Sequence, residues 1–350
     1  MAEPESVSRA RAIADDLLFP RALDTDASGV VPRENLDALA AAGLYGVIGP
    51  LEAGGLGADF GTFLEVVEIL SGGCLSSAFI WVQHHGVLRA VASSSTPGLR
   101  ERWLAPLCSG EIRAGIALAG LLSGPARITA RRSDGSWILS GTAPWVTGWG
   151  RMDIIQVAGR DEDDNVVSVL VDARPAPGFE FDPPLELVAL SSTATSAAHL
   201  RDLRVPDDRV ISVQPLAERQ QQDHNTLRVH AALAFGVAAR CIRMIGETPL
   251  ETELASVRLR LEQAEPREVP AAKAAASELA HRAAATLVVA TGSRSLIRTE
   301  HAQRLAREAL FLLVFGSRPT IKSALLGSLA ATPAPSEAAV PDTIRTPGTG

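Results

Sequence analysis

Two tryptophans and a threonine lie close together in one short segment, Pro144-Trp145-Val146-Thr147-Gly148-Trp149-Gly150. Indole rings provide a flat apolar wall, and a hydroxyl with neighbouring backbone amides provides hydrogen bonds, so the segment suits a planar heteroaromatic ligand such as a flavin. The same residues would also form a tryptophan corner in the core of a β-sandwich. The residue types alone leave both interpretations open.

The histidine spacings do not suit a metal site. Neighbouring residues of a helix point about 100° apart, so His84 and His85 cannot share an ion, and His224 and His230 are six residues apart rather than four. We expect packed or surface positions for His84 and His85, with a place at a cavity as the alternative. The sequence contains no zinc-protease, nucleophile-elbow or phosphate-loop motif, so hydrolase, protease and kinase functions have no support. No metal site is expected.

The glycines of residues 55–61 do not have the spacing of a dinucleotide-binding loop, and no strand–helix–strand unit surrounds them. We expect a tight loop between two helices there.

The composition is that of a globular enzyme. Hydrophobic residues make up 46% of the 350 residues and charged residues 21%, which excludes a disordered chain. A net charge of −7 argues against nucleic-acid binding. The three cysteines, Cys74, Cys108 and Cys241, are far apart and odd in number, which excludes a disulfide framework. Residues 1–16 lack a signal core, and no run of about 18 apolar residues exists, so we expect a cytoplasmic protein that contacts no membrane.

The hydrophobic periodicity changes twice along the chain. Helical spacing extends from Ser6 to about Arg113, and short strands with polar turns follow, including hairpins over 127–141 and 154–171. Long helical patterns return after residue 217, at 223–244, 271–291 and 303–315.

These patterns predict an α+β fold. It consists of an N-terminal helical domain (1–113), a central antiparallel β-barrel or sandwich (114–216) and a C-terminal helical bundle (217–331). Prolines and glycines in residues 332–350 indicate a disordered tail.

Several motifs, in the right order over residues 20 to 330, resemble the acyl-CoA dehydrogenase family of flavoproteins. The matching segments are an N-terminal helix and glycine loop (36–57), the flavin signature Gly135-Ser136-Trp137-Ile138-Leu139-Ser140-Gly141 followed by Trp145-Val146-Thr147, the strand 199–206 and the late helix motif Arg307-Glu308-Ala309. The resemblance implies an FAD-dependent oxidoreductase that acts on an acyl thioester or related small organic substrate. It also implies that Trp145, Val146 and Thr147 contact the flavin, with the Thr147 hydroxyl near the N5 edge.

The sequence departs from the family where a catalytic base belongs. The family's glutamate lies nine residues after the arginine of its late helix motif, a position that Gly316 occupies here. Some relatives carry the glutamate ten residues before a helical glycine, and Gly236 then gives Thr226. Asp223 lies one helical turn before Thr226 and is the candidate substitute, although an aspartate in a first turn is more often a cap. Gly316→Glu is expected to return some activity if the pocket admits an acyl chain.

Other flavin-binding positions also differ. The loop over 117–124 lacks the family's Thr and Glu, and no Arg-x-x-Phe-Gly motif follows Gly246. Two alternatives therefore stay open, a flavin monooxygenase of the same fold, with His84 or His85 near the flavin edge, and a catalytically silent subunit that pairs with an active paralogue. We expect a homo-oligomer, dimer or tetramer, or a pairing with a paralogous subunit, formed through the small-residue helices after residue 217.

Overall fold

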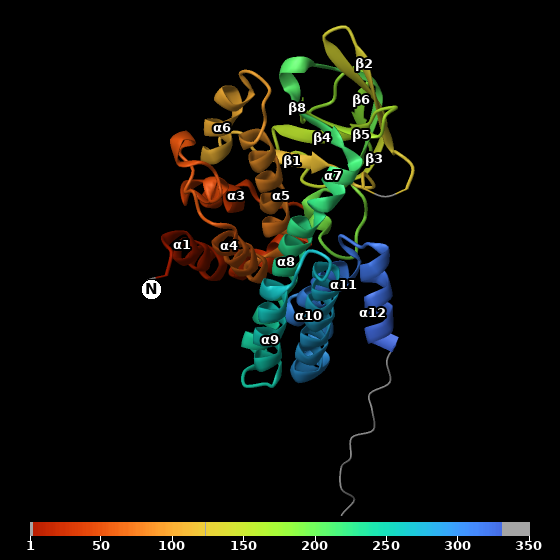
Figure 1. Ribbon diagram of the computed structural model, residues 1–350. Coiled ribbons are helices and arrows are strands. Elements are labelled where there is room, and N and C mark those ends of the chain that lie inside the picture. Colours follow the sequence, from red (N-terminus) through yellow and green to blue (C-terminus); the bar gives the residue numbers. More distant parts are fainter. Residues whose placement is uncertain (1–2, 123, 331–350) are drawn as a thin grey trace, which may run out of the picture.

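The computed structural model describes residues 3–122 and 124–330, in which helices, strands and again helices follow one another. The predicted tail at 332–350 lies outside these residues. Figure 1 shows the N-terminal helices beside the strands and the long C-terminal helices on the opposite side of the molecule from the sheet's outer hairpins. The N-terminal helices are α1 (Glu5–Ile13), a π-helix (Ala14–Leu18), α2 (Phe19–Ser28), α3 (Arg33–Ala41), α4 (Phe60–Gly73), α5 (Leu75–Ala92) and α6 (Leu99–Ser109).

The strands form one mixed sheet in the order β6-β7-β3-β2-β4-β5-β8, with β1 paired to β4. The strands are β1 (Ala114–Ala117), β2 (Ile128–Ser133), β3 (Ser136–Val146), β4 (Ile154–Arg160), β5 (Asn165–Asp172), β6 (Phe179–Phe181), β7 (Ser196–Pro206) and β8 (Val210–Pro215). The predicted α+β order of helices, sheet and helices is confirmed. Most strand pairs are antiparallel as expected, but the sheet is mixed, because β1 and β4 run parallel and β2 meets β4 in parallel at one residue pair. The β2–β3 hairpin between β1 and β4 supplies the crossover that a parallel pair needs.

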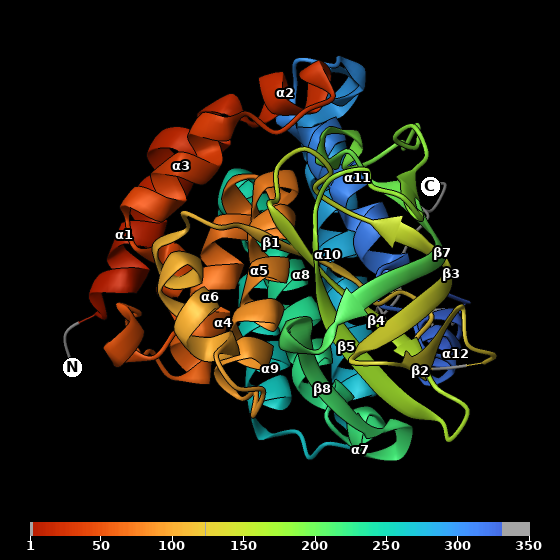
Figure 2. The same ribbon diagram turned by 90° about the horizontal axis from the view of Figure 1, so that it is seen from above.

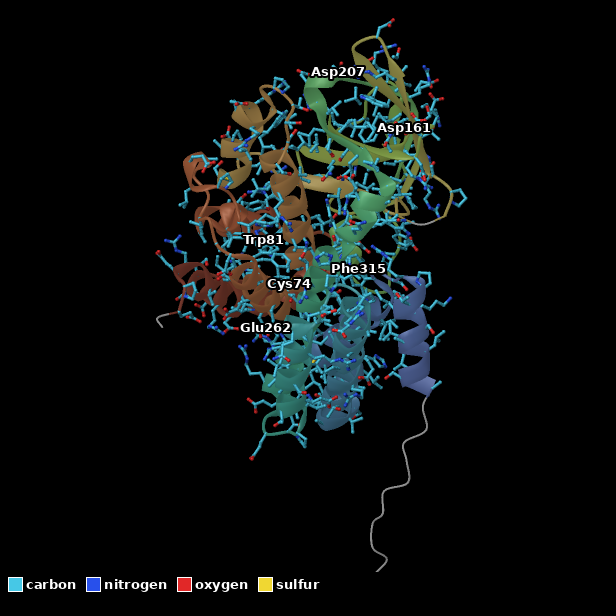
Figure 3. All side chains as sticks on the ribbon, in the orientation of Figure 1. Cys74, Trp81, Asp161, Asp207, Glu262 and Phe315 are labelled. Carbon is cyan, nitrogen blue, oxygen red and sulfur yellow. The ribbon has the colours of Figure 1, made fainter. Side chains whose placement is uncertain are left out.

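The two predicted hairpins are confirmed. Asp134 and Gly135 connect β2 to β3, and Gly135 has the positive φ of 62° that such a turn requires. The turn between β4 and β5 is closed by Asp161, whose carboxylate accepts hydrogen bonds from the backbone N–H groups of Asp163 and Asn165. Figure 3 shows Asp161 at the outer part of the sheet.

The C-terminal helices are α7 (Leu216–Gln221), α8 (Asp223–Ile245), α9 (Leu250–Gln263), α10 (Val269–Thr291), α11 (His301–Val314) and α12 (Pro319–Ala330). They share one hydrophobic core with the N-terminal helices, whereas the sheet has a core of its own. Figure 2 shows α4 and α5 beside α8. Glycines allow α4 and α8 to approach closely, since a Cβ added at Gly236 would lie 2.0 Å from the carbonyl oxygen of Glu68.

Among the residues that the structure describes, no helix combines the length and apolar character needed to cross a membrane.

Candidate functional site between the sheet and the helical core

The segment Trp145–Gly148 forms a turn at the end of β3, next to the helical core. Val146 and Thr147 are buried, whereas Trp145 remains 55% exposed. The N–H of Gly148 donates to the carbonyl of Thr193 over 2.8 Å, and a Cβ added to Gly148 would lie 3.3 Å from Ile80 of α5. The turn is therefore held between α5 and the 3-10 helix Ser191–Thr193, with one indole left uncovered.

Three threonine hydroxyls form a chain behind this turn. Thr147 Oγ1 lies 3.0 Å from Thr195 Oγ1, which lies 2.9 Å from Thr193 Oγ1, and Thr193 donates to the carbonyl of Leu190 over 2.7 Å. A hydroxyl has one proton and a carbonyl can only accept. Thr195 therefore donates to Thr193, and Thr147 donates to Thr195. The Thr147 hydroxyl consequently offers lone pairs, rather than its proton, to a ligand at the turn.

A second wall of the site comes from the ends of α8 and α11. Phe315 directly follows α11, and its ring lies 4.3 Å from the ring of His230 on α8. Phe79, which precedes Ile80 on α5, packs edge-on against Phe315 at 4.7 Å and thus links this wall to the Trp145 turn. Figure 3 shows Phe315 where the helical bundle meets the sheet.

The two positions at which the family carries its base meet at this wall. Thr226 and His230 are one turn apart on α8 and so share a face. A Cβ added to Gly316 would lie only 2.2 Å from Nδ1 of His230, and Gly316 has a φ of 64°. The imidazole thus fills the space that a side chain at position 316 would need. Gly316→Glu alone is therefore not expected to return activity, contrary to the expectation from the sequence.

Asp223, the predicted substitute base, is engaged in an ion pair. Both of its carboxylate oxygens accept from the Arg318 guanidinium, at 2.9 Å each. It begins α8, but no side-chain cap bond is formed at this helix start. A role as base would require this two-pronged pair to open, and Asp223 stays a candidate on sequence grounds only.

Two cations, Arg318 and the buried Lys273, hold the loop after α11 through its carbonyl oxygens. Lys273 of α10 donates to the carbonyls of Phe315 at 2.9 Å and Leu312 at 3.3 Å, which satisfies oxygens at the end of α11. Burial lowers the pKa of Lys273 to about 8, with a further contribution from the positive charge of Arg318. Two cations and the Asp223 carboxylate thus surround the Gly316 loop.

His84 and His85 lie in the helical core and not at this site. His84 bonds to the carbonyl of Leu107 and accepts from the N–H of Ala114, and His85 bonds to the carbonyl of Leu44. Burial lowers the pKa of His84 well below 6.5 and that of His85 to about 4. Their packed positions, the favoured interpretation of the sequence, are confirmed. Figure 3 shows the neighbouring Trp81 among the N-terminal helices.

The motif Arg307-Glu308-Ala309 has a structural role in this chain. Arg307 pairs with Asp26 of α2 at 2.5 Å and donates to the carbonyl of Val188 at 3.0 Å. Glu308 is buried and accepts from Arg304 at 2.5 Å; burial raises the pKa of Glu308, and Arg304 opposes that shift. The motif therefore joins α11 to the N-terminal helices and contributes no free base.

The Trp145 turn suits the flavin ring of FAD, whereas the segments at the family's other flavin-binding positions lack the polar side chains that would bind the rest of the cofactor. The uncovered Trp145 and the lone pairs of Thr147 suit a planar ring system that carries hydrogen-bonding nitrogens. The loop over 117–122 contains only Ala, Leu and Gly, and its leucines pack against Ala158 and Val166. After Gly246 the chain enters α9, without an arginine at the family's position.

Sequence reasoning overlooked His230 because it considered only the spacing between this residue and His224. The usable signal was the four-residue spacing between Thr226 and His230, which places the imidazole on the face of the second family base position.

Comparisons with known proteins agree with this architecture. The model of the acyl-CoA dehydrogenase N-terminal domain matches residues 3–111. The bovine mitochondrial short-chain specific acyl-CoA dehydrogenase is 27% identical over 238 residues, which cover 65% of this chain and 58% of the relative. The chain thus spans a little over half the length of that relative, and 51% of its human counterpart.

Solved structures with the same fold cover nearly the whole chain. The butyryl-CoA dehydrogenase from Megasphaera elsdenii has a TM-score of 0.80 at 18% identity and covers 93% of this chain and 97% of its own. A glutaryl-CoA dehydrogenase from Mycobacterium smegmatis, solved in complex with FADH2, has a TM-score of 0.78 at 18% identity, with 95% of each chain covered. The N-terminal domain model, the curated relatives and the shared fold all point the same way, and the chain is similar to the acyl-CoA dehydrogenases.

Proposed function

We propose that the protein is an FAD-dependent oxidoreductase that acts on an acyl thioester or a related small organic substrate without a glutamate base at the usual positions. The observation that carries this proposal is the uncovered Trp145 indole beside the buried Thr147 hydroxyl, at the end of β3. A large apolar ring left exposed next to a fully packed turn is a surface that a flat ligand can cover.

FAD, when bound, supplies the acceptor for a hydride. The indole of Trp145 would lie against the flavin ring, and Thr147 would accept a hydrogen bond from the N–H at N5 of the reduced ring, since its own proton is donated to Thr195. The rings of Phe79, Phe311 and Phe315 would exclude water from the acyl group, because they pack together into one apolar wall.

Flavin binding is the first test of this proposal. Purified protein, or apoprotein mixed with FAD, is expected to show the absorption of bound flavin and a binding isotherm in calorimetry. Trp145→Ala is expected to weaken FAD binding, whereas Trp103→Ala, on α6 and under the guanidinium groups of Arg102 and Arg209, is the control. A colourless protein with no FAD isotherm contradicts the proposal and favours a silent subunit.

Flavin reduction is the second test. Anaerobic mixing of the FAD-loaded protein with saturated acyl-CoA thioesters is expected to bleach the flavin slowly, since general-base catalysis contributes about 10²- to 10⁴-fold and neither Thr226 nor Gly316 supplies a carboxylate. Rapid bleaching would contradict the expectation that a site without this glutamate removes the α-proton slowly. Bound flavin that no thioester reduces, but that NADPH and oxygen turn over, would favour a monooxygenase.

Assembly is also part of the proposal. We expect a dimer or tetramer, or a pairing with a paralogous subunit, through helices after residue 217. Large apolar side chains are exposed there, including Val289 at 80% and Leu296 at 83%.

A further inference from the structure

His230 lies where the two family base positions converge, and this placement rests on independent observations. The residue follows Thr226 by one turn on α8. A side chain at Gly316 would collide with its Nδ1. The approach of Gly316 to His230 joins parts of the chain that are 86 residues apart in sequence, so it is a property of the fold and not of a local motif.

The ring of His230 has hydrogen-bonding capacity that nothing in the described part of the chain uses. Its Nδ1 is covered and has no hydrogen-bond partner. The residue as a whole remains partly exposed, as do Phe315 and Gly316 beside it. Buried polar atoms without partners are uncommon, because a desolvated polar group that makes no hydrogen bond destabilises the folded state. The imidazole therefore keeps hydrogen-bonding capacity that the described residues leave unused, on a side chain that solvent still reaches in part.

We propose that the imidazole of His230 is the proton acceptor of this site, in place of the missing carboxylate. The proposal rests on the proposed function, because it takes the α-carbon of an acyl thioester as the proton donor. The Cα–H bond breaks, the proton moves to a ring nitrogen of His230, and the electron pair stays on the substrate as the thioester enolate.

The charges around the imidazole keep it in the proton-accepting form. The charged groups that act on it are Lys273 of α10 and Arg318 of the loop after α11, and the ring that packs against it is that of Phe315. Burial, followed by the charges of Lys273 and Arg318, lowers the pKa of His230 well below 6.5. The ring is therefore neutral at neutral pH, which is the state that a base requires.

Proton exchange tests the role without requiring oxidation. The probe is 3-thiabutyryl-CoA, in which sulfur replaces the β-carbon, so the α-proton can leave but no hydride can. FAD-loaded protein is incubated with it in D2O, and deuterium at the α-carbon is measured by mass spectrometry. The wild type is expected to exchange, and the rate is expected to fall only below pH 6.5, as the imidazole becomes protonated.

Two substitutions separate His230 from its surroundings. His230→Gln is expected to slow exchange by about 10²- to 10⁴-fold, the range typical of general-base catalysis. His224→Gln, on the same helix with its ring bonded to the carbonyl of Gln221, is the matched control and is expected to exchange like the wild type. His230→Phe keeps a ring against Phe315 and replaces His230→Gln if that variant does not fold.

An NMR measurement provides a second readout. With ¹³C-labelled histidine, the resonance absent from His230→Gln is expected to titrate below pH 6.5 and to move when 3-thiabutyryl-CoA is added. Absence of exchange in the wild type, or exchange in His230→Gln at the wild-type rate, overturns the proposal. The flavin absorption of each variant reports separately on the proposed function, so failure of one is distinguishable from failure of the other.

Discussion

The contact between His230 and Gly316 predicts a specific stability effect of a single methyl group. Gly316→Ala places a Cβ 2.2 Å from Nδ1 of His230 at a φ of 64°. A left-handed conformation costs an L-residue about 1–2 kcal/mol, and overpacking adds about 1–3 kcal/mol. We therefore expect Gly316→Ala to lower the free energy of unfolding by about 2–5 kcal/mol, the sum of the two ranges.

A control glycine separates the two contributions. Gly29, after α2, has a φ of 69° and nothing within 4 Å of an added Cβ, so Gly29→Ala carries the conformational cost alone. Urea unfolding followed by tryptophan fluorescence gives both values. In a His230→Ala background, the cost of Gly316→Ala is expected to fall toward that of Gly29→Ala, a coupling of about 1–3 kcal/mol. Equal costs for the two glycine variants in the wild-type background would refute the placement of His230.

The same geometry determines how a carboxylate can be returned to this site. Gly316→Glu alone meets the imidazole, whereas the double variant Gly316→Glu with His230→Ala provides room for the glutamate. We expect thioester-dependent flavin bleaching to increase in the double variant and not in Gly316→Glu.

Three further predictions concern the cofactor, pH and assembly. Thr195→Val interrupts the hydroxyl chain and frees the Thr147 proton to bond N5 of oxidised flavin. Because this bond stabilises the oxidised form, the flavin midpoint potential measured by dye-coupled reduction is expected to become more negative. An unchanged potential would contradict the inferred direction of the hydrogen bonds. Unfolded histidines gain protons near pH 6.5, whereas buried His85 does so only near pH 4. The free energy of unfolding is therefore expected to fall as the pH drops from 6.5 toward 4, and to fall less in His85→Gln. Parallel curves of unfolding free energy against pH for the wild type and the variant would contradict this. Val289→Glu, at a side chain that is 80% exposed, is expected to reduce the oligomer mass measured by light scattering. Leu51→Glu, at a side chain that is 72% exposed among the N-terminal helices, is expected to leave that mass unchanged. A monomeric mass for the wild type would contradict the proposed assembly.

Features decided by neighbouring residues could be predicted from the sequence. The β2–β3 hairpin follows from Asp134 and Gly135, because an Asp-Gly pair between two strand-forming segments is a strong hairpin signal. The long helices α8, α10 and α11 follow from apolar residues at helical spacing. The Trp145 turn was also found, since its residue types are unusual wherever they occur together.

Features decided by distant contacts could not be predicted. The parallel pairing of β1 with β4 joins Ala114 to Ile154 across a whole hairpin, and no periodicity reports such a pairing. The helix α9 was missed because only Leu254 and Leu261 are buried along it, which is too weak an apolar stripe to be recognised. The position of His230 depends on how α8 meets the loop after α11. In the sequence, Gly316 indicates only that this loop leaves space for a neighbouring side chain, not which side chain fills it.

The loss of the glutamate also changes the charge that a substrate meets. A carboxylate at position 316 would have faced Lys273 and Arg318 as a partner, whereas the neutral imidazole of His230 leaves Asp223 as the one carboxylate in the described ion pairs around this loop. A neutral base has a lower affinity for a proton in this positive surrounding, but the same cations stabilise the negative charge that develops on a thioester as its α-proton leaves. The site therefore exchanges base strength for enolate stabilisation, and substrates with more acidic α-protons should be the ones on which it acts.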